Sequence, residues 1–257
     1  MDLASSKRLA YVAIQERDAL MRKLTTLLGA ALLAGSIQTA AAATAFYSDF
    51  DTTLNSAIAP GGASLTGVQG YAGLGPVGNQ FSGNFLRSAT ANTVTLTLNA
   101  LPEHSSLSLG FLFAAIDSLD GTGSFPAGDF FTVSIDGTTI FRESFANALP
   151  SQTQSYAPPA GVQLARMTDL GFGGPGGFNT DSAYNLAADP VFSNIAHTGS
   201  SVTISFRMEG DGVQDLNDES WAMDNLRVDV VPVPLPAAVW LLGSALGGLG
   251  LLRRRVA

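Results

Sequence analysis

The fold is decided by the stretch Phe131-Thr-Val-Ser-Ile-Asp-Gly-Thr-Thr-Ile-Phe141. Apolar and polar residues alternate in residues 131–135, and the pair Asp136 and Gly137 separates this run from the β-branched and aromatic residues 138–141. A period of two places the apolar side chains on one face of a β-strand, and Asp-Gly is a preferred dipeptide for a two-residue hairpin turn. The stretch therefore predicts two antiparallel strands joined by a tight turn.

The same alternation recurs on both sides of this hairpin. It is found in residues 93–98, 107–113, 202–206 and 223–230. The 28 glycines and 12 prolines of the chain fall mostly between these runs, and no helical period of any length interrupts them. Many short antiparallel strands with turn-rich connections predict an all-β fold, namely a two-sheet β-sandwich of jelly-roll-like type.

The C-terminal segment, residues 231–257, has a different composition. A proline-rich motif leads into residues 235–252, which contain no ionisable side chain. About 18 such residues are the minimum that spans a bilayer as a helix, and a following arginine cluster favours the cytoplasmic side. We therefore predict a single transmembrane helix at 235–252, the alternative being a buried apolar helix of a soluble protein. The motif and the cluster consist of Val233, Pro234, Leu235, Pro236 and Ala237, and of Arg253, Arg254 and Arg255.

Over residues 233–255 this segment resembles the PEP-CTERM sorting signal in its VPLPA variant. The resemblance implies export by a Gram-negative bacterium that makes exopolysaccharide, and processing near the proline motif by an exosortase. It further implies at least a transient membrane anchor and a final place at the cell surface or in the extracellular matrix. It implies no activity for the rest of the chain.

The N-terminal segment has the order of a secretory signal peptide. Arg22 and Lys23 precede the apolar residues 24–34, and alanines near position 43 offer small side chains to signal peptidase. We predict a helical signal peptide over residues 21–45, with cleavage after Ala43 or Ala45. Residues 1–20 are polar and of mixed charge, so we expect the true start at Met21. The β-sandwich domain is then expected over residues 46–230.

The region between these two segments is strongly acidic. Residues 46–231 contain 18 carboxylates and 5 arginines, with no lysine, for a net charge of −13. Nucleic acid is excluded as a partner because phosphate binding needs a basic face. The charge either keeps the domain soluble or binds a divalent cation such as Ca²⁺, which prefers clustered carboxylates. The chain has no cysteine, so the exported domain depends on its core.

Five blocks of the central region also resemble an uncharacterised family of secreted β-sandwich domains. That family reads Leu-Pro-x-His-Ser, Ile-Asp-Ser-Trp-Asp-Gly and Asp-Glu-Ser-Trp-Gly-x-Asp-Asn. The resemblance implies a jelly-roll domain of carbohydrate-binding type and brings no catalytic activity. This chain has Leu119 where the family has tryptophan and Ala127 where it often has proline, which weakens the idea of sugar stacking there. The blocks here are residues 101–106, 116–121, 128–137, 154–156 and 218–228.

The carboxylates of these blocks predict a cation site. Asp117, Asp120 and Asp129 lie in a glycine-rich loop, while Asp224 and Asp49 lie at the last and first strands. The first and last strands of a jelly roll are often neighbours, so carboxylates from both ends can meet. We predict one structural Ca²⁺ bound by a subset of these residues, with Asp224 as the leading ligand. The alternative is that they are turn aspartates that accept backbone hydrogen bonds. Asp51, Asp218 and Glu219 belong to the wider set.

Two histidines and three tyrosines are further candidates. His104 and His197 each precede a serine-rich alternation. We favour a role for each in satisfying turn backbone; a shared zinc site would require a third ligand. Tyr71, Tyr156 and Tyr184 are candidates for stacking against sugar rings.

Together these features predict an exported, non-catalytic surface or matrix protein, associated with glycan or exopolysaccharide and stabilised by Ca²⁺. Its expected partners are signal peptidase, an exosortase, the membrane and exopolysaccharide. The alternative is a secreted carbohydrate-active enzyme, a glycosidase or a lyase, with a pair of catalytic carboxylates. The sequence contains no Gly-x-Ser-x-Gly motif and no cysteine nucleophile.

Overall fold

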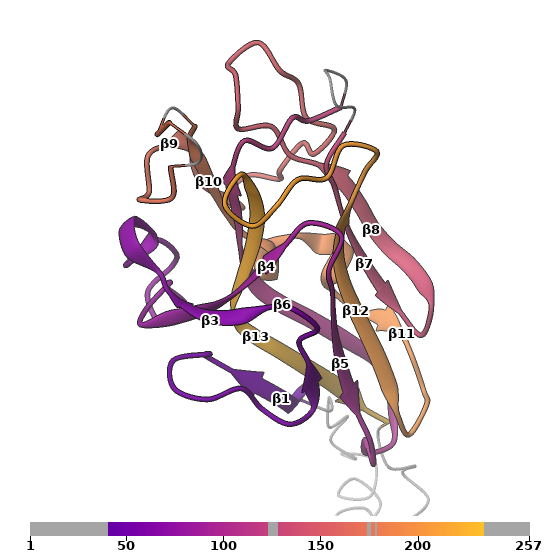
Figure 1. Ribbon diagram of the computed structural model, residues 1–257. Helices are drawn as coiled ribbons and strands as arrows, with labels where there is room; N and C mark the ends of the chain where they lie inside the picture. Colours follow the sequence, from indigo (N-terminus) through magenta and orange to yellow (C-terminus); the bar gives the residue numbers. More distant parts are fainter. Residues whose placement is uncertain (1–40, 123–127, 174–175, 178, 234–257) are drawn as a thin grey trace, which may run out of the picture. The chain divides into compact units, whose positions relative to one another are not determined.

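The computed structural model describes residues 41–122, 128–173, 176–177 and 179–233, and these form a β-sandwich (Figure 1). The described residues contain two antiparallel sheets and no α-helix, which confirms the predicted all-β class. The larger sheet consists of β1 (Ala43–Ser48), β3 (Ser64–Gly67), β4 (Asn84–Ala89), β6 (His104–Asp117), β9 (Gln163–Thr168), β10 (Asp181–Asn185), β11 (Ile195–Ala196) and β13 (Glu219–Pro232). The smaller sheet consists of β2 (Ile58–Ala59), β5 (Thr93–Leu98), β7 (Phe130–Ile135), β8 (Thr138–Ser144) and β12 (Val202–Glu209). Three short 3₁₀ helices, η1 (Gln69–Tyr71), η2 (Leu186–Ala188) and η3 (Pro190–Phe192), lie in the connections.

The six predicted strands are confirmed. They lie within β5, β6, β7, β8, β12 and β13. The Asp-Gly turn joins β7 to β8, and Asp136 and Gly137 have positive φ values of 49° and 79°. Positive φ at both central residues is typical of the turn whose twist matches that of the flanking strands. The smaller sheet has the order β2-β5-β12-β7-β8.

Two long strands form the centre of the larger sheet. β6 and β13 have 14 residues each and pair along most of their length, in the order β3-β4-β13-β6-β10-β9. The other edge of β13 is divided, since β4 pairs with residues 220–223 and β1 with residues 226–230. The first and last strands are therefore neighbours, as expected for carboxylates that come from both ends of the domain.

A β-bulge divides β13 into two halves. The register with β6 shifts between Asp224 and Arg227, and Asn225 has φ = +51°. Before the bulge Met223 faces the core, and after it Leu226 does, so the alternation changes phase. An extra residue in a strand has this effect and re-aims the side chains beside it. The sequence had predicted an uninterrupted alternation here.

An aromatic core fills the space between the sheets. The ring centroid of Phe131 lies 4.3 Å from that of Phe113 and 5.1 Å from that of Trp221. A second apolar cluster, which includes Tyr71 and Phe85, covers one half of the outer face of the larger sheet. The aromatic packing supplies much of the apolar burial of a domain without disulfides. The other half of that outer face remains polar.

The predicted terminal segments lie outside the described residues, apart from their inner ends. Residues 21–40 of the signal peptide, residues 235–252 and the cluster at 253–255 are among them. No helix in the described part of the chain is both long and apolar enough to cross a bilayer. Of the sorting motif only Val233 is described; its N–H donates to the carbonyl of Glu103 at 3.3 Å.

Candidate functional site

Three carboxylates meet at a buried position, and they are called here the carboxylate cluster. One oxygen from each of Asp120, Asp129 and Glu219 lies within 4.8 Å of the others. Their exposed fractions are 8%, 2% and 0%. Among the described residues, these three carboxylates are the side chains that lie close enough to one another to hold a metal ion together. Asp120 and Asp129 are two of the five favoured ligands, and Glu219 comes from the wider set.

Separate segments bring these side chains together. Asp120 lies in the loop after β6, Asp129 immediately before β7, and Glu219 at the start of β13. The N–H of Asp120 donates to Oδ2 of Asp129 at 2.6 Å, and Gln152 Nε2 donates to Oδ1 of Asp120 at 2.6 Å. Gln214 donates to both oxygens of Glu219, at 3.0 and 2.9 Å. Neutral donors therefore orient the three carboxylates, whose charges repel one another.

The pKa values of the cluster reflect this confinement. Burial, reinforced by the charge of Asp129, raises the pKa of Glu219 to about 8, although Gln214 opposes the shift. Burial also raises the pKa of Asp129 to about 6, against the hydrogen bond from the N–H of Asp120. The pKa of Asp120 is raised for the same reason. Burial and like charge favour the neutral form of a carboxylate, so at neutral pH the cluster takes up a proton or requires a cation.

Asp224 and Asp49 are not part of the carboxylate cluster. Asp224 is fully buried and accepts hydrogen bonds from the N–H groups of Ser82 at 3.2 Å and Asn225 at 2.7 Å. Burial raises the pKa of Asp224 to about 7. Five residues of extended strand, roughly 16 Å, separate Asp224 from Glu219. The structure therefore gives Asp224 the backbone-accepting role that was the alternative.

Asp49 and Asp117, the other predicted ligands outside the carboxylate cluster, have partners of their own. The exposed Asp49 accepts from the N–H of Asp51 at 3.2 Å, again a turn interaction. Asp117 lies opposite Glu219 in the β6–β13 register, and its N–H donates to Oδ1 of Asp181 at 3.1 Å. Asp117 is therefore not one of the three carboxylates of the cluster, although register places it opposite Glu219.

The two histidines contact each other directly. His104 Nε2 lies 2.7 Å from His197 Nδ1, His104 Nδ1 lies 2.6 Å from the carbonyl of Pro102, and His197 Nε2 lies 3.1 Å from Oδ2 of Asp136. Two nitrogens bound to one zinc ion at about 2.0 Å each in tetrahedral geometry would stand farther apart than this contact. The 2.7 Å distance between the two rings fits a hydrogen bond from one histidine to the other. The predicted contact with turn backbone is confirmed for His104, which lies beside the carbonyl of Pro102, whereas His197 contacts the side chain of Asp136 in the β7–β8 turn.

The three tyrosines proposed for sugar stacking belong to the core. Tyr71 and Tyr184 are fully buried, and Tyr156 is 6% exposed. The hydroxyl of Tyr156 donates to Oδ2 of Asp189 at 2.7 Å. The stacking prediction is therefore wrong for these residues. The sequence around a single tyrosine in a turn-rich region does not show whether its side chain is buried. Leu119 is fully buried too, so a larger aromatic at that position would not present a face to a sugar.

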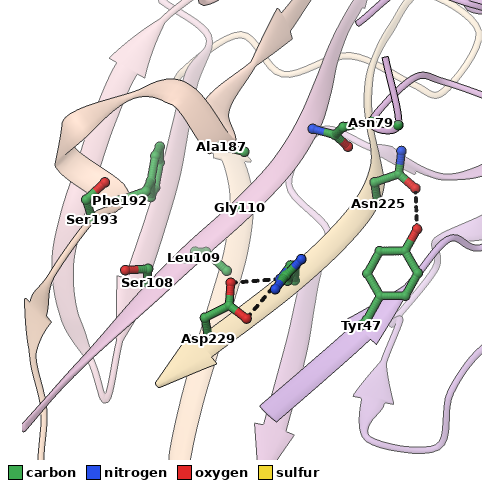
Figure 2. A pocket seen from close by; sticks show the side chains of 12 residues that line it. Tyr47, Asn79, Ser108, Leu109, Gly110, Ala187, Phe192, Ser193, Asn225 and Asp229 are labelled. Carbon is green, nitrogen blue, oxygen red and sulfur yellow. Dashed lines mark hydrogen bonds and ion pairs between the residues drawn. The ribbon is translucent and has the colours of Figure 1, made fainter. Parts of the chain in front are cut away.

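A groove lined by both polar and apolar residues lies on the open half of the outer face of the larger sheet (Figure 2). We call it the β1–β13 groove; its volume is about 270 Å³. Tyr47 lies at the edge of the groove and is 53% exposed. Its hydroxyl donates to Oδ1 of Asn225 at 2.9 Å. The groove is defined here by Tyr47, Asn79, Ser108, Asn225, Arg227 and Asp229.

Strand register builds the groove. Arg227 stands between Tyr47 of β1 and Gly110 of β6, and Asp229 stands beside Ser108 in the next row. Arg227 Nε lies 2.7 Å from Oδ2 of Asp229. Tyr47 was not among the tyrosines predicted to stack on sugars, and residues 43–48 show no alternation that would mark it as exposed.

Comparisons with known proteins give only distant likenesses. No family model and no curated protein matches the chain. The K3 adhesin domain of Lys-gingipain from Porphyromonas gingivalis is 15% identical with a TM-score of 0.36, over 72% of this chain and 99% of that one. The GH115 4-O-methyl-α-glucuronidase BtGH115A is 11% identical with a TM-score of 0.34, over 78% and 19%. A glucanotransferase from Paenibacillus sp. is 11% identical with a TM-score of 0.30, over 72% and 18%. The chain thus spans less than a fifth of either enzyme.

Proposed function

We propose that this chain is an exported, non-catalytic protein of the cell surface or extracellular matrix, whose jelly-roll-type β-sandwich associates with glycans. The observation that carries the proposal is the β1–β13 groove, where Tyr47 is exposed beside polar side chains. A sugar ring presents C–H groups on its face and hydroxyls on its edge. The electronegative face of a tyrosine ring attracts the C–H groups of the sugar, while carboxylate, guanidinium and amide groups form hydrogen bonds with its hydroxyls.

The limits of the domain support export and sorting. β1 begins at Ala43 and β13 ends at Pro232, so the strands, apart from Ala43 itself, lie between a cleavage site after Ala43 and the sorting motif that begins at Val233. Of the two predicted cleavage positions, we favour the one after Ala43. It retains Thr44, whose Oγ1 donates to Oδ1 of Asp229 at 2.8 Å. Cleavage after Ala45 would remove half of β1.

Burial of the carboxylate cluster supports a non-catalytic role. Glycosidase carboxylates stand about 5 to 9.5 Å apart and must contact the sugar between them. The oxygens of Asp120, Asp129 and Glu219 come within 4.8 Å of one another and are buried. In the groove, Asp229 is paired with Arg227. These arrangements disfavour the alternative of a glycosidase or lyase.

We assign the predicted Ca²⁺ to the carboxylate cluster, in place of a site around Asp224. Ca²⁺ takes six to eight oxygen ligands and tolerates irregular geometry, and it would neutralise charges that otherwise need protons. Its role is to stabilise the sandwich where the loops before β7 and β13 meet. It takes no part in glycan binding.

The proposal is tested by expressing the full chain in a Gram-negative host that contains an exosortase, and in the same host without that gene. We expect a shortened product at the surface or in the matrix of the first host, and a membrane-retained product in the second. Incubation with the host's exopolysaccharide should retain the protein without release of reducing sugar. An uncut product dissolved in the cytosol would contradict export, and release of reducing sugar would favour the enzyme.

A further inference from the structure

We infer that the β1–β13 groove binds an uncharged pyranose unit of a polysaccharide, with Tyr47 as the stacking surface and the Arg227–Asp229 pair as the hydroxyl-binding group. The inference rests on the proposed function and names its ligand class and its site. It follows from three features of the groove: a fixed aromatic ring, a complementary pair of polar groups, and an acidic surrounding.

The ring of Tyr47 is held in place before any ligand arrives. Its hydroxyl donates to Oδ1 of Asn225 at 2.9 Å, and Nδ2 of Asn225 donates to the carbonyl of Gln80 at 3.0 Å. The bulge in β13 gives Asn225 its positive φ and turns it outward to meet Tyr47 (Figure 2). Binding to a pre-ordered aromatic loses little conformational entropy, which is how an exposed tyrosine contributes affinity.

The polar pair next to this ring matches a hydroxyl group. The carboxylate of Asp229 can only accept hydrogen bonds and the guanidinium of Arg227 can only donate them, whereas a sugar hydroxyl does both. Arg227 Nη2 also donates to Oγ1 of Thr44 at 2.7 Å, so the pair is braced from β1. The side chain of Arg227 is 53% exposed, so a ligand can reach the guanidinium, and Ala187 occupies the space over Gly110, the neighbour of Arg227 in β6. Adjacent hydroxyls of one ring can therefore reach both partners.

The charges around the groove decide between neutral and acidic glycans. The charge of Arg227 is already compensated by Asp229. Burial, and then the charges of Asp49, Asp224 and Asp51, raise the pKa of the Tyr47 phenol, while the charge of Arg227 opposes the shift, so the carboxylates outweigh the arginine at this site. A uronate or sulfate would be repelled by them and by the net charge of −13 in residues 46–231. An uncharged sugar is unaffected.

Affinity electrophoresis of the full chain in mild detergent tests the inference. The gels contain dextran, laminarin or galactomannan as neutral polymers, and alginate or polygalacturonate as acidic ones. We expect at least one neutral polymer to retard the protein and the acidic ones not to. Tyr47→Ala should weaken binding about tenfold or more, the equivalent of about 1.4 kcal/mol. Tyr47→Phe keeps the ring and should weaken it only about threefold or less. Leu149→Ala, at another exposed apolar residue, is the matched control and should bind like the parent.

Three results would overturn the inference: no retardation by any neutral polymer, equal retardation of the parent and Tyr47→Ala, or stronger retardation by alginate than by the neutral polymers. Near-UV and far-UV circular dichroism show whether Tyr47→Ala is folded; since Tyr47 is 53% exposed, we expect an unchanged spectrum apart from the loss of one tyrosine. Export and processing of the parent protein are measured separately in the host. A groove that binds no glycan in a protein that is correctly exported would therefore contradict this inference and leave the sorting part of the proposed function intact.

Discussion

Replacing Glu219 by glutamine should make the stability of the domain much less dependent on pH. In the parent protein burial raises the pKa of Glu219 from 4.5 to about 8. A carboxyl group whose pKa is higher in the folded than in the unfolded state stabilises the fold fully below its unfolded value. That contribution is lost as the pH rises through the folded value. The window for Glu219 therefore runs from about pH 4.5 to about pH 8.

The expected loss follows from the size of this difference. A shift from 4.5 to about 8 corresponds to a decrease in the free energy of unfolding on the order of 4 kcal/mol between pH 5 and pH 9. Asp129, with a pKa of about 6, titrates within the same window, so the two carboxylates act as a coupled pair and their contributions do not add. Glutamine keeps the shape of Glu219 and removes its charge, so most of the decrease should disappear in the variant.

Calcium should reverse the same decrease. With a dissociation constant of about 10 μM, 1 mM Ca²⁺ would stabilise the folded state by about 2.7 kcal/mol. We expect this gain at pH 8, where the carboxylates of the cluster can ionise, and no gain at pH 5, where protons occupy them. Glu219→Gln should show a smaller gain than the parent at pH 8 and, like the parent, no gain at pH 5.

Urea denaturation followed by far-UV circular dichroism at pH 5, 7, 8 and 9 measures these effects, with and without 1 mM Ca²⁺. The matched control is Glu103→Gln at an exposed carboxylate, which should behave like the parent. The reasoning fails if the parent is equally stable at pH 5 and pH 9, or if Glu219→Gln loses as much stability as the parent. A calcium effect of equal size at pH 5 and pH 8 would refute the assignment of the ion to this cluster.

Three further predictions concern the core, a turn and the sorting motif. Phe131→Ala should lower the free energy of unfolding by about 3 to 5 kcal/mol in urea denaturation, because it opens a cavity between Phe113 and Trp221. Gly121→Ala should lower the melting temperature, with a loss of about 2 kcal/mol or more, since this glycine has φ = +75° and an added Cβ would lie 2.2 Å from a backbone oxygen; unchanged melting would contradict that geometry. Replacing Pro234 and Pro236 together by alanine should leave the full-length chain unprocessed in a host with an exosortase, as seen by its size on a gel.

The features that could be predicted from the sequence are local ones. The alternation in residues 93–98 and the Asp-Gly turn were sufficient for β5 and for the β7–β8 hairpin, because strand period and turn geometry depend on adjacent residues. The neighbouring first and last strands were also expected correctly. The bulge at Asn225 was not predicted, although two polar residues separate the apolar Met223 from Leu226 and so break the alternation there.

The candidate sites required the positions of residues far apart in the chain. Glu219 and Asp129 meet because two different strands begin at the same end of the sandwich, whereas Asp224, in the same block as Glu219, lies too far along its strand to join them. Likewise, nothing in the sequence separates the buried Tyr71 from the exposed Tyr47, since burial depends on which elements cover a residue.

The sequence by itself determined the all-β class and the net negative charge, and it predicts a signal peptide and a sorting segment at the two ends, since each depends on the order or number of side chains along the chain. Only the tertiary structure decided which carboxylates come together, which tyrosine faces solvent and where a groove lies. Those outcomes depend on strand register, on one bulge and on the packing of the two sheets, which join residues separated by tens to hundreds of positions.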